Sequence, residues 1–458
     1  MQGRRTDLAD VQLKLTGWLQ KKMPRAKKLS ISSLERSGSG LSNESFIFDL
    51  RWQEAGRHKS EGMVLRCAPR SYTTFAEYDL SKQFRIMKAL QGTSVPVPKV
   101  YWLEEDTGLL GTSFYVMSKI DGVIPPDYPP YHSFGVYYDA TPEQRARIWW
   151  GCLENLVRIH KLDWKALGLS FLGSPGGGTD PLDRQLNWWE GYMDWVLKEG
   201  GEPQPILRAA LQWLKENRYV PDRVSLCWGD CRMGNTIYRR SDFAVLAILD
   251  WEMAYLGDPE SELGWLILLD WVSSEGYGIP RLEGTPGREE TIQRYEELTG
   301  WKVKHMFYQD VMAALIYGAL ISRTTKNLKK LGVPVPDDSE TNNPCTQRLA
   351  NLLDLPAPGG APLRQITKTE EVTVTVQFHL TGPGGRDWYL VCDKGKASRR
   401  EGIIENPNCT MTVSAEDWAA IQRGEMERMH AWTAGKLKME GDITLLMQLE
   451  EVITKLGG

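Results

Sequence analysis

The sequence predicts an α+β protein built from a small mixed lobe, a helical lobe and a C-terminal sheet domain. Alternating apolar residues and short turns dominate roughly the first 120 positions, whereas apolar residues at helical spacing dominate from about position 141. Strand-like alternation returns after position 364. With 458 residues, the chain is long enough for two or three domains with large cores.

The first lobe is expected over residues 1–120. Apolar spacing predicts a helix over 6–23, and a turn of small residues at 37–43 separates two strands. A third strand is expected over 61–69. The segment 75–90 carries apolar residues on one helical face and is followed by glycine, so a helix is predicted there. A hairpin of two further strands completes this lobe.

The helical lobe is expected over residues 121–332. Its first long helix should begin at Thr141, a capping residue followed by proline. Further helices are predicted over 183–198, 204–217, 259–272, 288–299 and 305–328. Residues 333–363 are rich in Pro, Gly, Asn and Asp at both ends, which predicts a linker around one short helix.

The C-terminal part, residues 364–458, is expected to form a separate α+β domain. "EVTVTVQFHL" alternates as a half-buried strand does, and "WYLVCDKG" follows it after a glycine-rich turn. A helix is predicted over 415–422. The chain should finish with a second helix whose apolar residues lie mostly on one face, namely Ile443, Leu446, Met447, Leu449 and Val452.

Charge and composition exclude several classes of protein. The net charge of −4 predicts no general attraction to nucleic acid. The sequence has no run of about 18 apolar residues, so no membrane span is expected. The seven cysteines are odd in number and form no CxxC pair, so we expect reduced thiols and a cytoplasmic location. Cys227 and Cys231 lack the second ligand pair of a zinc site.

The stretch "CWGDCRMGNTIYRR" carries the candidate chemistry. Asp230 and Asn235 are five positions apart between two short predicted strands, and Asp250 ends the next apolar run. Phosphoryl transfer needs a carboxylate that accepts a hydroxyl proton and hard oxygen ligands for Mg²⁺. This spacing supplies both. The alternative is that glycine, aspartate and asparagine here are only turn residues.

Together with "AILDWEMAYLGDPESELGW", this stretch resembles the signature of the aminoglycoside phosphotransferase family, in the branch related to hydroxyacyl-CoA kinases. The resemblance implies a bilobal, protein-kinase-like fold that uses ATP and Mg²⁺. It implies that Asp230 is the catalytic base and that Asn235 and Asp250 hold the metal. Two positions depart from the family pattern. Trp228 replaces the usual histidine, and Cys231 replaces an aromatic residue or leucine.

The same resemblance implies that the first lobe binds the nucleotide. Ser39, Gly40 and Asn43 lie in "SGSGLSN", where small residues allow backbone N–H groups to approach phosphate. This turn lacks the lysine of a P-loop, and a plain hairpin turn is the alternative.

Four more residues are implied in nucleotide binding. Arg66 lies where kinases keep a strand lysine, and a guanidinium can hold phosphate and carboxylate oxygens together. Glu77 is its expected partner, early in the next helix. The alternative for this pair is two ordinary surface charges. "FYVMSKIDG" resembles the hinge between the lobes, so the backbone of Ser118 and Ile120 should face the adenine.

The C-terminal domain resembles the sterol carrier protein 2 family in "NPNCTMTVSAEDWAAIQRGEM" and "WTAGKLKMEGD". That resemblance implies a five-stranded sheet with helices around an apolar tunnel for acyl chains, acyl-CoA or sterols. Several methionines add adaptable apolar surface. The alternative is a packed domain used for dimerisation or rigidity, and the sequence assigns neither lipid-contacting residues nor an oligomeric state.

These resemblances together predict an ATP-dependent phosphotransferase that acts on a hydroxyl of an apolar or acyl-type substrate. Two rivals remain. A lipid-binding protein with a degenerate kinase lobe would explain Trp228 and Cys231. An aminoglycoside resistance kinase would need a strongly acidic cleft for polycations, whereas the helical segment is rich in tryptophan.

Overall fold

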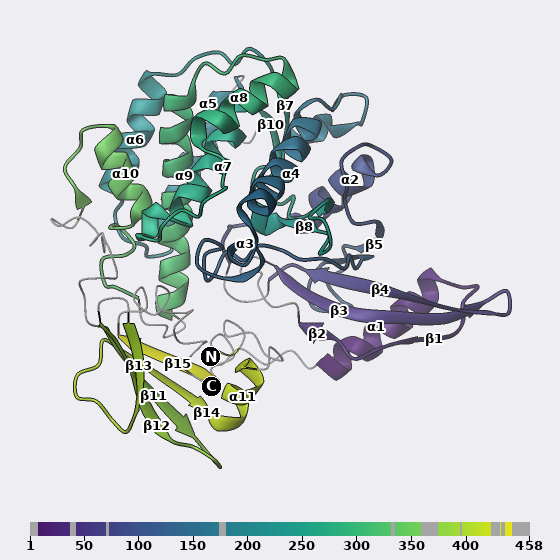
Figure 1. Ribbon diagram of the computed structural model, residues 1–458. Coiled ribbons are helices and arrows are strands. Elements are labelled where there is room, and N and C mark those ends of the chain that lie inside the picture. The colour runs from purple at the N-terminus through teal and green to yellow at the C-terminus, as the bar shows by residue number, and fades with distance from the viewer. Residues whose placement is uncertain are drawn as a thin grey trace.

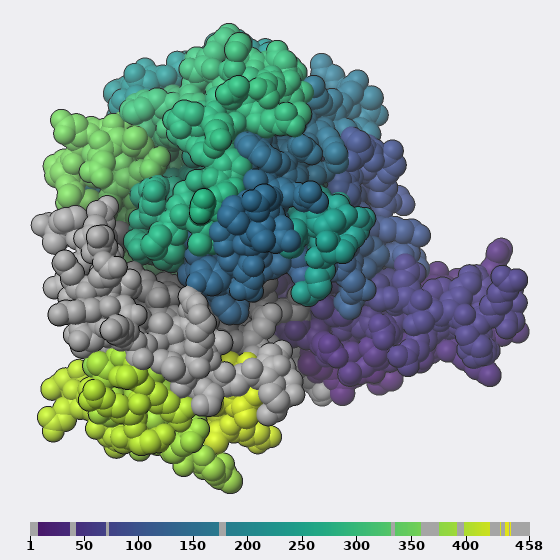
Figure 2. All heavy atoms as spheres, viewed as in Figure 1, coloured from purple at the N-terminus to yellow at the C-terminus, as the bar shows by residue number. Residues whose placement is uncertain are grey.

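A computed structural model describes residues 8–36, 43–69, 73–173, 180–330, 335–358, 374–393, 396–422, 431 and 436–441. Three groups of elements are visible in Figure 1: a twisted sheet with a helix beside it, a large helical lobe, and a second sheet near the C-terminus. The first lobe projects to one side of the helical lobe, as the purple spheres in Figure 2 show. The predicted α+β class is confirmed.

The first lobe is an antiparallel sheet with helices on both of its faces. Its elements are α1 (Leu8–Lys22), β1 (Lys27–Ile31), β2 (Glu35–Arg36), β3 (Glu44–Glu54), β4 (Arg57–Cys67), α2 (Leu80–Leu90), β5 (Val100–Glu104) and β6 (Phe114–Ser118). The strand order is β1-β3-β4-β6-β5, with β2 paired to β3. The predicted strands and the final hairpin are present.

Alternation along the strands decides which side chains face the helical lobe. Phe48 on β3 and Leu65 on β4 are buried in a core shared with α1. Tyr115 on β6 belongs to the other core, which α2 shares with the helical lobe. Because side chains alternate between the faces of a strand, Arg66 lies on the face opposite Leu65, toward the helical lobe.

Helix α2 begins five residues later than the sequence predicts. Asp79 caps it, since its Oδ1 atom accepts a hydrogen bond from the backbone N–H of Lys82 at 2.8 Å. Tyr78 holds the preceding residues in another conformation, because its hydroxyl accepts from the N–H of Thr74 at 2.8 Å. Glu77 therefore precedes the helix, and its expected place inside the first turn is wrong.

The helical lobe contains long helices and two small two-stranded sheets. Its elements are α3 (Gly135–Tyr138), α4 (Pro142–His160), α5 (Pro181–Lys198), α6 (Pro205–Glu216), β7 (Ser225–Cys227), β8 (Thr236–Tyr238), β9 (Val245–Ile248), β10 (Tyr255–Gly257), α7 (Glu260–Val272), α8 (Arg288–Thr299), α9 (Met306–Lys330) and α10 (Pro344–Leu352). Short 3₁₀ turns cover Leu169–Leu172, Met233–Asn235 and Glu275–Tyr277. The six helices predicted in this lobe are present. The first begins one residue after Thr141, and the other five begin and end within two residues of their predicted bounds.

Helix α10 lies in the segment expected to be a linker. It packs against α9 and α6, and its Cys345 and Leu349 are fully buried in the core of the helical lobe. We therefore propose that the helical lobe extends through α10 and that the linker begins after it.

The C-terminal domain holds a five-stranded sheet. Its elements are β11 (Val374–Thr381), β12 (Asp387–Asp393), β13 (Lys396–Glu401), β14 (Cys409–Ser414), α11 (Ala415–Gln422) and β15 (Leu437–Gly441). The order is β13-β12-β11-β14-β15, and β11 and β14 run parallel. Phe378 stacks on Trp388 with ring centroids 3.7 Å apart in a separate core. The predicted final helix lies outside the described residues.

The N-terminal cap of α4 provides a test of the fold. Thr141 and Gln144 form a reciprocal capping box, in which each side chain accepts the other residue's backbone N–H. We expect Thr141→Ala to lower the unfolding free energy by about 1 kcal/mol, because an N–H at the helix start loses its acceptor. Thermal melts should show a lower Tm for Thr141→Ala and a near wild-type Tm for Thr141→Ser. Equal melting of the alanine variant and wild type would contradict the cap.

Candidate functional site

The two small sheets of the helical lobe place the candidate loop. Strand β7 pairs with β10, and β8 pairs with β9, so the loop between β7 and β8 lies beside the segment between β9 and β10. The backbone N–H of Leu249 donates to the carbonyl of Asn235 at 2.8 Å and joins the two segments. This pairing brings Asp250 next to Asp230 and Asn235.

The Asp230 carboxylate is held from three directions. Its Oδ2 atom accepts from Asn235 Nδ2 at 2.8 Å and from Arg232 Nε at 3.0 Å. Its Oδ1 atom accepts from the indole N–H of Trp265 at 3.1 Å. Such a carboxylate has one orientation, which general-base catalysis requires. The amide nitrogen of Asn235 donates to Asp230, so the Oδ1 atom of Asn235 is left as the candidate metal ligand.

Arg66 joins the two lobes through Asp250. Its NH2 atom lies 2.7 Å from Asp250 Oδ1, although the residues are 184 positions apart. Burial alone would lower the pKa of Arg66, but the charges of Asp250 and its neighbours raise it above the usual value. Within the described residues, the buried Nε of Arg66 has no hydrogen-bond partner. An orphaned guanidinium N–H beside the Asp250 carboxylate fits a site for Mg²⁺ and phosphate.

Glu252 lies closer to this centre than the predicted Glu77. Arg66 pairs with Asp250 rather than with Glu77, because Glu77 lies before α2 on the rim of the cleft described below. Glu252 Oε2 accepts from Asn43 Nδ2 at 2.7 Å, which ties the residue before β3 to the helical lobe. The sequence signal for Glu252 was its place two residues after Asp250.

Four other residues are predicted to contact the nucleotide. Ser39 and Gly40 lie outside the described residues. Ser118 ends β6, and its backbone N–H donates to the carbonyl of Lys99 at 2.8 Å. Ile120 follows β6 and is half-buried. Contact of Ser118 and Ile120 with adenine stays a prediction.

Sequence reasoning missed a second ion pair at the loop. Arg232 NH1 lies 2.7 Å from Asp127 Oδ2, while its Nε contacts Asp230. Burial opposes the charge of Arg232, but Asp127 and Asp230 raise its pKa above the usual value. Asp127 comes from a segment more than a hundred positions upstream, so spacing along the sequence could not connect these residues.

The carboxylate of Glu262 fixes the backbone of the loop. It accepts the N–H of Trp228 at Oε2 and the N–H of Gly229 at Oε1, each at 2.6 Å. His160 Nε2 lies 3.0 Å from Oε2 on the other side, and its Nδ1 lies 2.8 Å from the Tyr295 hydroxyl. A buried carboxylate with these partners holds the residues that precede Asp230.

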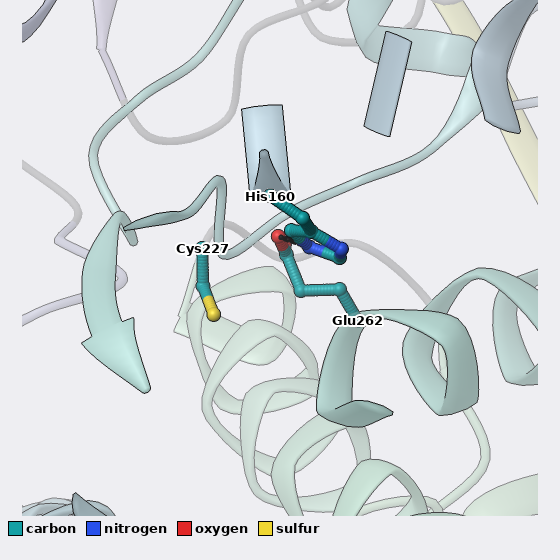
Figure 3. A group of neighbouring side chains, drawn as sticks. All are labelled: His160, Cys227 and Glu262. Carbon is teal, nitrogen blue, oxygen red and sulfur yellow. Dashed lines mark hydrogen bonds and ion pairs between the residues drawn. The ribbon is translucent and has the colours of Figure 1, made fainter. Parts of the chain in front are cut away.

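Cys227, His160 and Glu262 lie close enough together to bind a metal ion (Figure 3). Both nitrogens of His160 already have partners, and Glu262 already accepts two backbone N–H groups. Burial raises the pKa of the Cys227 thiol well above its usual value, so the ligand form is disfavoured. We assign this trio a structural function.

Cys231 departs from the family pattern, but its own polar group, the thiol, has a hydrogen-bond partner. It is fully buried, and its thiol donates to the carbonyl of Glu262 at 3.1 Å. Burial raises the pKa of this thiol well above its usual value. Cys231 therefore packs the loop against α7 as a small neutral side chain.

A cleft of about 260 Å³ reaches the loop at Gly229. Aromatic side chains make up much of its wall, namely Phe75, Tyr78, Trp188, Trp189, Tyr255 and Trp265. Lys82 and Glu252 also line it, and Glu77 and Asp79 lie at its exposed rim. The cleft can take a ligand of mainly apolar character next to Asp230.

Comparisons with known proteins agree with this geometry. Residues 34–302 match the model of the phosphotransferase enzyme family, and residues 364–454 match that of the SCP-2 sterol transfer family. The first match covers more than half of the chain, so the chain belongs to the phosphotransferase enzyme family. Its C-terminal part is an SCP2 domain.

Three individual proteins illustrate the similarity. Mouse acyl-CoA dehydrogenase family member 10 is 32% identical over 48% of this chain, and human sterol carrier protein 2 is 33% identical over 16%. These matches span 19% and 13% of the two relatives, so the chain corresponds to a minor part of each. A Ralstonia eutropha JMP134 crystal structure named for the aminoglycoside phosphotransferases covers 75% of this chain and 98% of its own, with 24% identity and a TM-score of 0.56. This likeness shows that the chain has the kinase-like fold. In the part of the chain that the structure describes, none of the helices is long and apolar enough to cross a bilayer.

Lys82, which lines the cleft, should make the stability of the fold depend on pH. Burial lowers its pKa to about 8, although Asp79 and Glu252 oppose this shift. The unfolded chain keeps this proton up to a pH of about 10.4, so between these values it binds more protons than the folded chain and stability rises with pH. We expect the Tm of wild type, relative to that of Lys82→Met, to increase between pH 7.5 and 10.

Thermal melts of both proteins across this pH range measure the effect, and other titrating groups cancel in the difference. Lys88→Met is the matched control, because Lys88 is exposed on the same helix. A Tm difference for Lys82→Met that varies with pH no more than the difference for Lys88→Met would contradict the assignment.

Proposed function

We propose that this chain is an ATP-dependent phosphotransferase that phosphorylates a hydroxyl of an apolar or acyl-type substrate. The observation that carries the proposal is the meeting of Asp230, Asn235, Asp250 and Arg66 in one site between the lobes. These residues supply a base, two oxygen donors for a cation and a guanidinium for phosphate, the set that phosphoryl transfer requires.

Each residue has a stated task in this proposal. Asp230 orients the acceptor hydroxyl and accepts its proton as the phosphoryl group transfers. Asn235 and Asp250 would hold Mg²⁺, and Arg66 would align the phosphates. Bound Mg²⁺ supplies neutralisation of the phosphate charge. Glu77 at the cleft rim stays a predicted nucleotide residue.

The aromatic cleft supports an apolar acceptor. It reaches Gly229, the residue next to Asp230, so a hydroxylated molecule in the cleft can present its oxygen to the carboxylate. Tryptophan and tyrosine walls supply the large apolar contact area that an acyl or other apolar group needs. The SCP2 domain supports a lipid or acyl ligand, and we propose that it binds the substrate or a related apolar group.

Nucleotide binding separates this proposal from a lipid-binding protein with an inactive kinase lobe. We expect millimolar Mg-ATP to raise the Tm by several degrees, because a ligand at about 100 times its Kd adds about 2.7 kcal/mol of stability. Thermal melts with Mg-ATP, ATP plus a chelator, and Mg²⁺ alone measure the effect. Asp250→Asn is expected to lose most of the shift. A wild-type Tm that does not respond to Mg-ATP would favour the lipid-binding alternative.

The turnover rate of an Asp230 variant tests whether Asp230 acts as the catalytic base. ATP consumption, measured over hydroxyacyl-CoAs, alcohols, sterols and aminoglycosides, identifies an acceptor. With that acceptor, Asp230→Asn should lower kcat at least 100-fold while the protein stays folded, since positioned general bases contribute about 10²–10⁴-fold. Asp194→Asn is the control, because Asp194 is an exposed aspartate paired with Arg208. An Asp230→Asn enzyme with most of its activity would refute the assigned role.

A further inference from the structure

Trp228 contacts both parts of the candidate site, the loop that carries Asp230 and the turn that carries Asp250. It follows β7 directly and precedes Gly229 and Asp230. Its side chain is fully buried, with its ring centroid 6.1 Å from that of Trp251. The indole N–H is the only polar group on this side chain, so its direction shows what the residue holds.

That N–H binds the backbone at Asp250. Trp228 Nε1 donates to the carbonyl of Leu249 at 2.7 Å and lies 3.2 Å from the carbonyl of Asp250. One donor is therefore shared between the two carbonyl groups at the end of β9. Buried carbonyl groups without a donor are costly, so loss of this N–H would favour rearrangement of the turn.

The backbone at Asp250 adopts an uncommon conformation. Asp250 has φ of +57°, in the left-handed region that few residues with a side chain adopt, although aspartate tolerates it better than most. This conformation turns the chain out of β9 and accompanies the placement of the carboxylate against Arg66. Strained backbone persists where the surroundings fix it. The indole N–H is a direct hydrogen-bond donor to the carbonyl groups of this turn.

The main chain of Trp228 is fixed independently of its side chain. Its N–H donates to Glu262 on α7, as does that of Gly229. Trp228 thus connects α7 to the turn at Asp250, with the backbone bonded to one and the indole to the other. Trp228 therefore bridges the helix that fixes the chain before Asp230 and the turn that carries Asp250.

We infer that Trp228 is a positioning residue, which holds the metal-binding carboxylate of Asp250 in register with Asp230 through its indole N–H. The inference rests on the proposed function, because it requires a cation at Asp250. It also gives the replacement of histidine by tryptophan a physical meaning. Trp228 retains an aromatic ring N–H that can donate a hydrogen bond, so the substitution is compatible with an active lobe.

Metal affinity is the property that this residue should control. Mn²⁺ can be titrated into the purified full-length chain with saturating ATP and followed by electron paramagnetic resonance. Trp228→Phe keeps an aromatic ring and removes the N–H, so we expect Mn²⁺ to bind about tenfold more weakly, as is usual when the partner of a metal ligand is lost. Trp228→His restores a ring N–H and should recover affinity to within about threefold of wild type.

Trp149→Phe is the matched control. Trp149 is also buried, and its indole donates one hydrogen bond, to Thr291 Oγ1 at 3.0 Å, away from the site. This variant should lose stability in thermal melts without losing Mn²⁺ affinity. Equal Mn²⁺ affinity of Trp228→Phe and wild type would overturn the inference, as would an equal loss in Trp149→Phe.

Two further outcomes separate this inference from the proposed function. If wild type binds no Mn²⁺ with ATP, the proposed function and the inference fall together. If wild type binds and Trp228→Phe does not fold, Trp228→His decides. Affinity within about threefold of wild type supports the inference, and a tenfold loss at an unchanged Tm overturns it.

Discussion

The buried carboxylate of Glu262 is the interaction on which the rest of the site depends. It lies at the start of α7, fully desolvated, and it is stable there because two backbone N–H groups and His160 surround it. These bonds fix the chain immediately before Asp230. Gly229 is required at this point, because it has φ of +92° and a Cβ atom would lie 2.2 Å from the carbonyl of Met253. A helix of the core therefore sets the direction of the candidate base.

Across the interface of the lobes, Arg66 and Asp250 form the complementary constraint. The pair lies 2.7 Å apart and is mostly shielded from solvent, so each charge depends on the other. Strand alternation turns Arg66 toward the helical lobe, and the left-handed turn brings Asp250 to meet it. Asn43 and Glu252 add a second contact between the same two lobes. The candidate nucleotide site is thus built where the lobes hold each other.

Local pattern predicted most of the elements, because periodicity and caps act within a few residues. The cap at Thr141 and the strand β11 are examples that the structure confirms. The expected helix over 75–90 was wrong at its start because Asp79 caps the helix there, while the Tyr78 hydroxyl accepts the backbone N–H groups of Thr74 and Phe75. The short helix of the expected linker packs into the helical lobe. The sequence did not predict this, because the segments on both sides of the helix are polar.

The sequence by itself determined the family, the order of Asp230, Asn235 and Asp250, and the presence of two differently built sheets, because these depend on short motifs and periodicity. Only the tertiary structure decided that Arg66 meets Asp250 instead of Glu77, that Asp127 reaches Arg232, and that Trp228 donates to the turn at Asp250. Those contacts join segments separated by about 20 to nearly 200 positions. Their geometry follows from how the helices and sheets pack, which spacing along one chain does not encode.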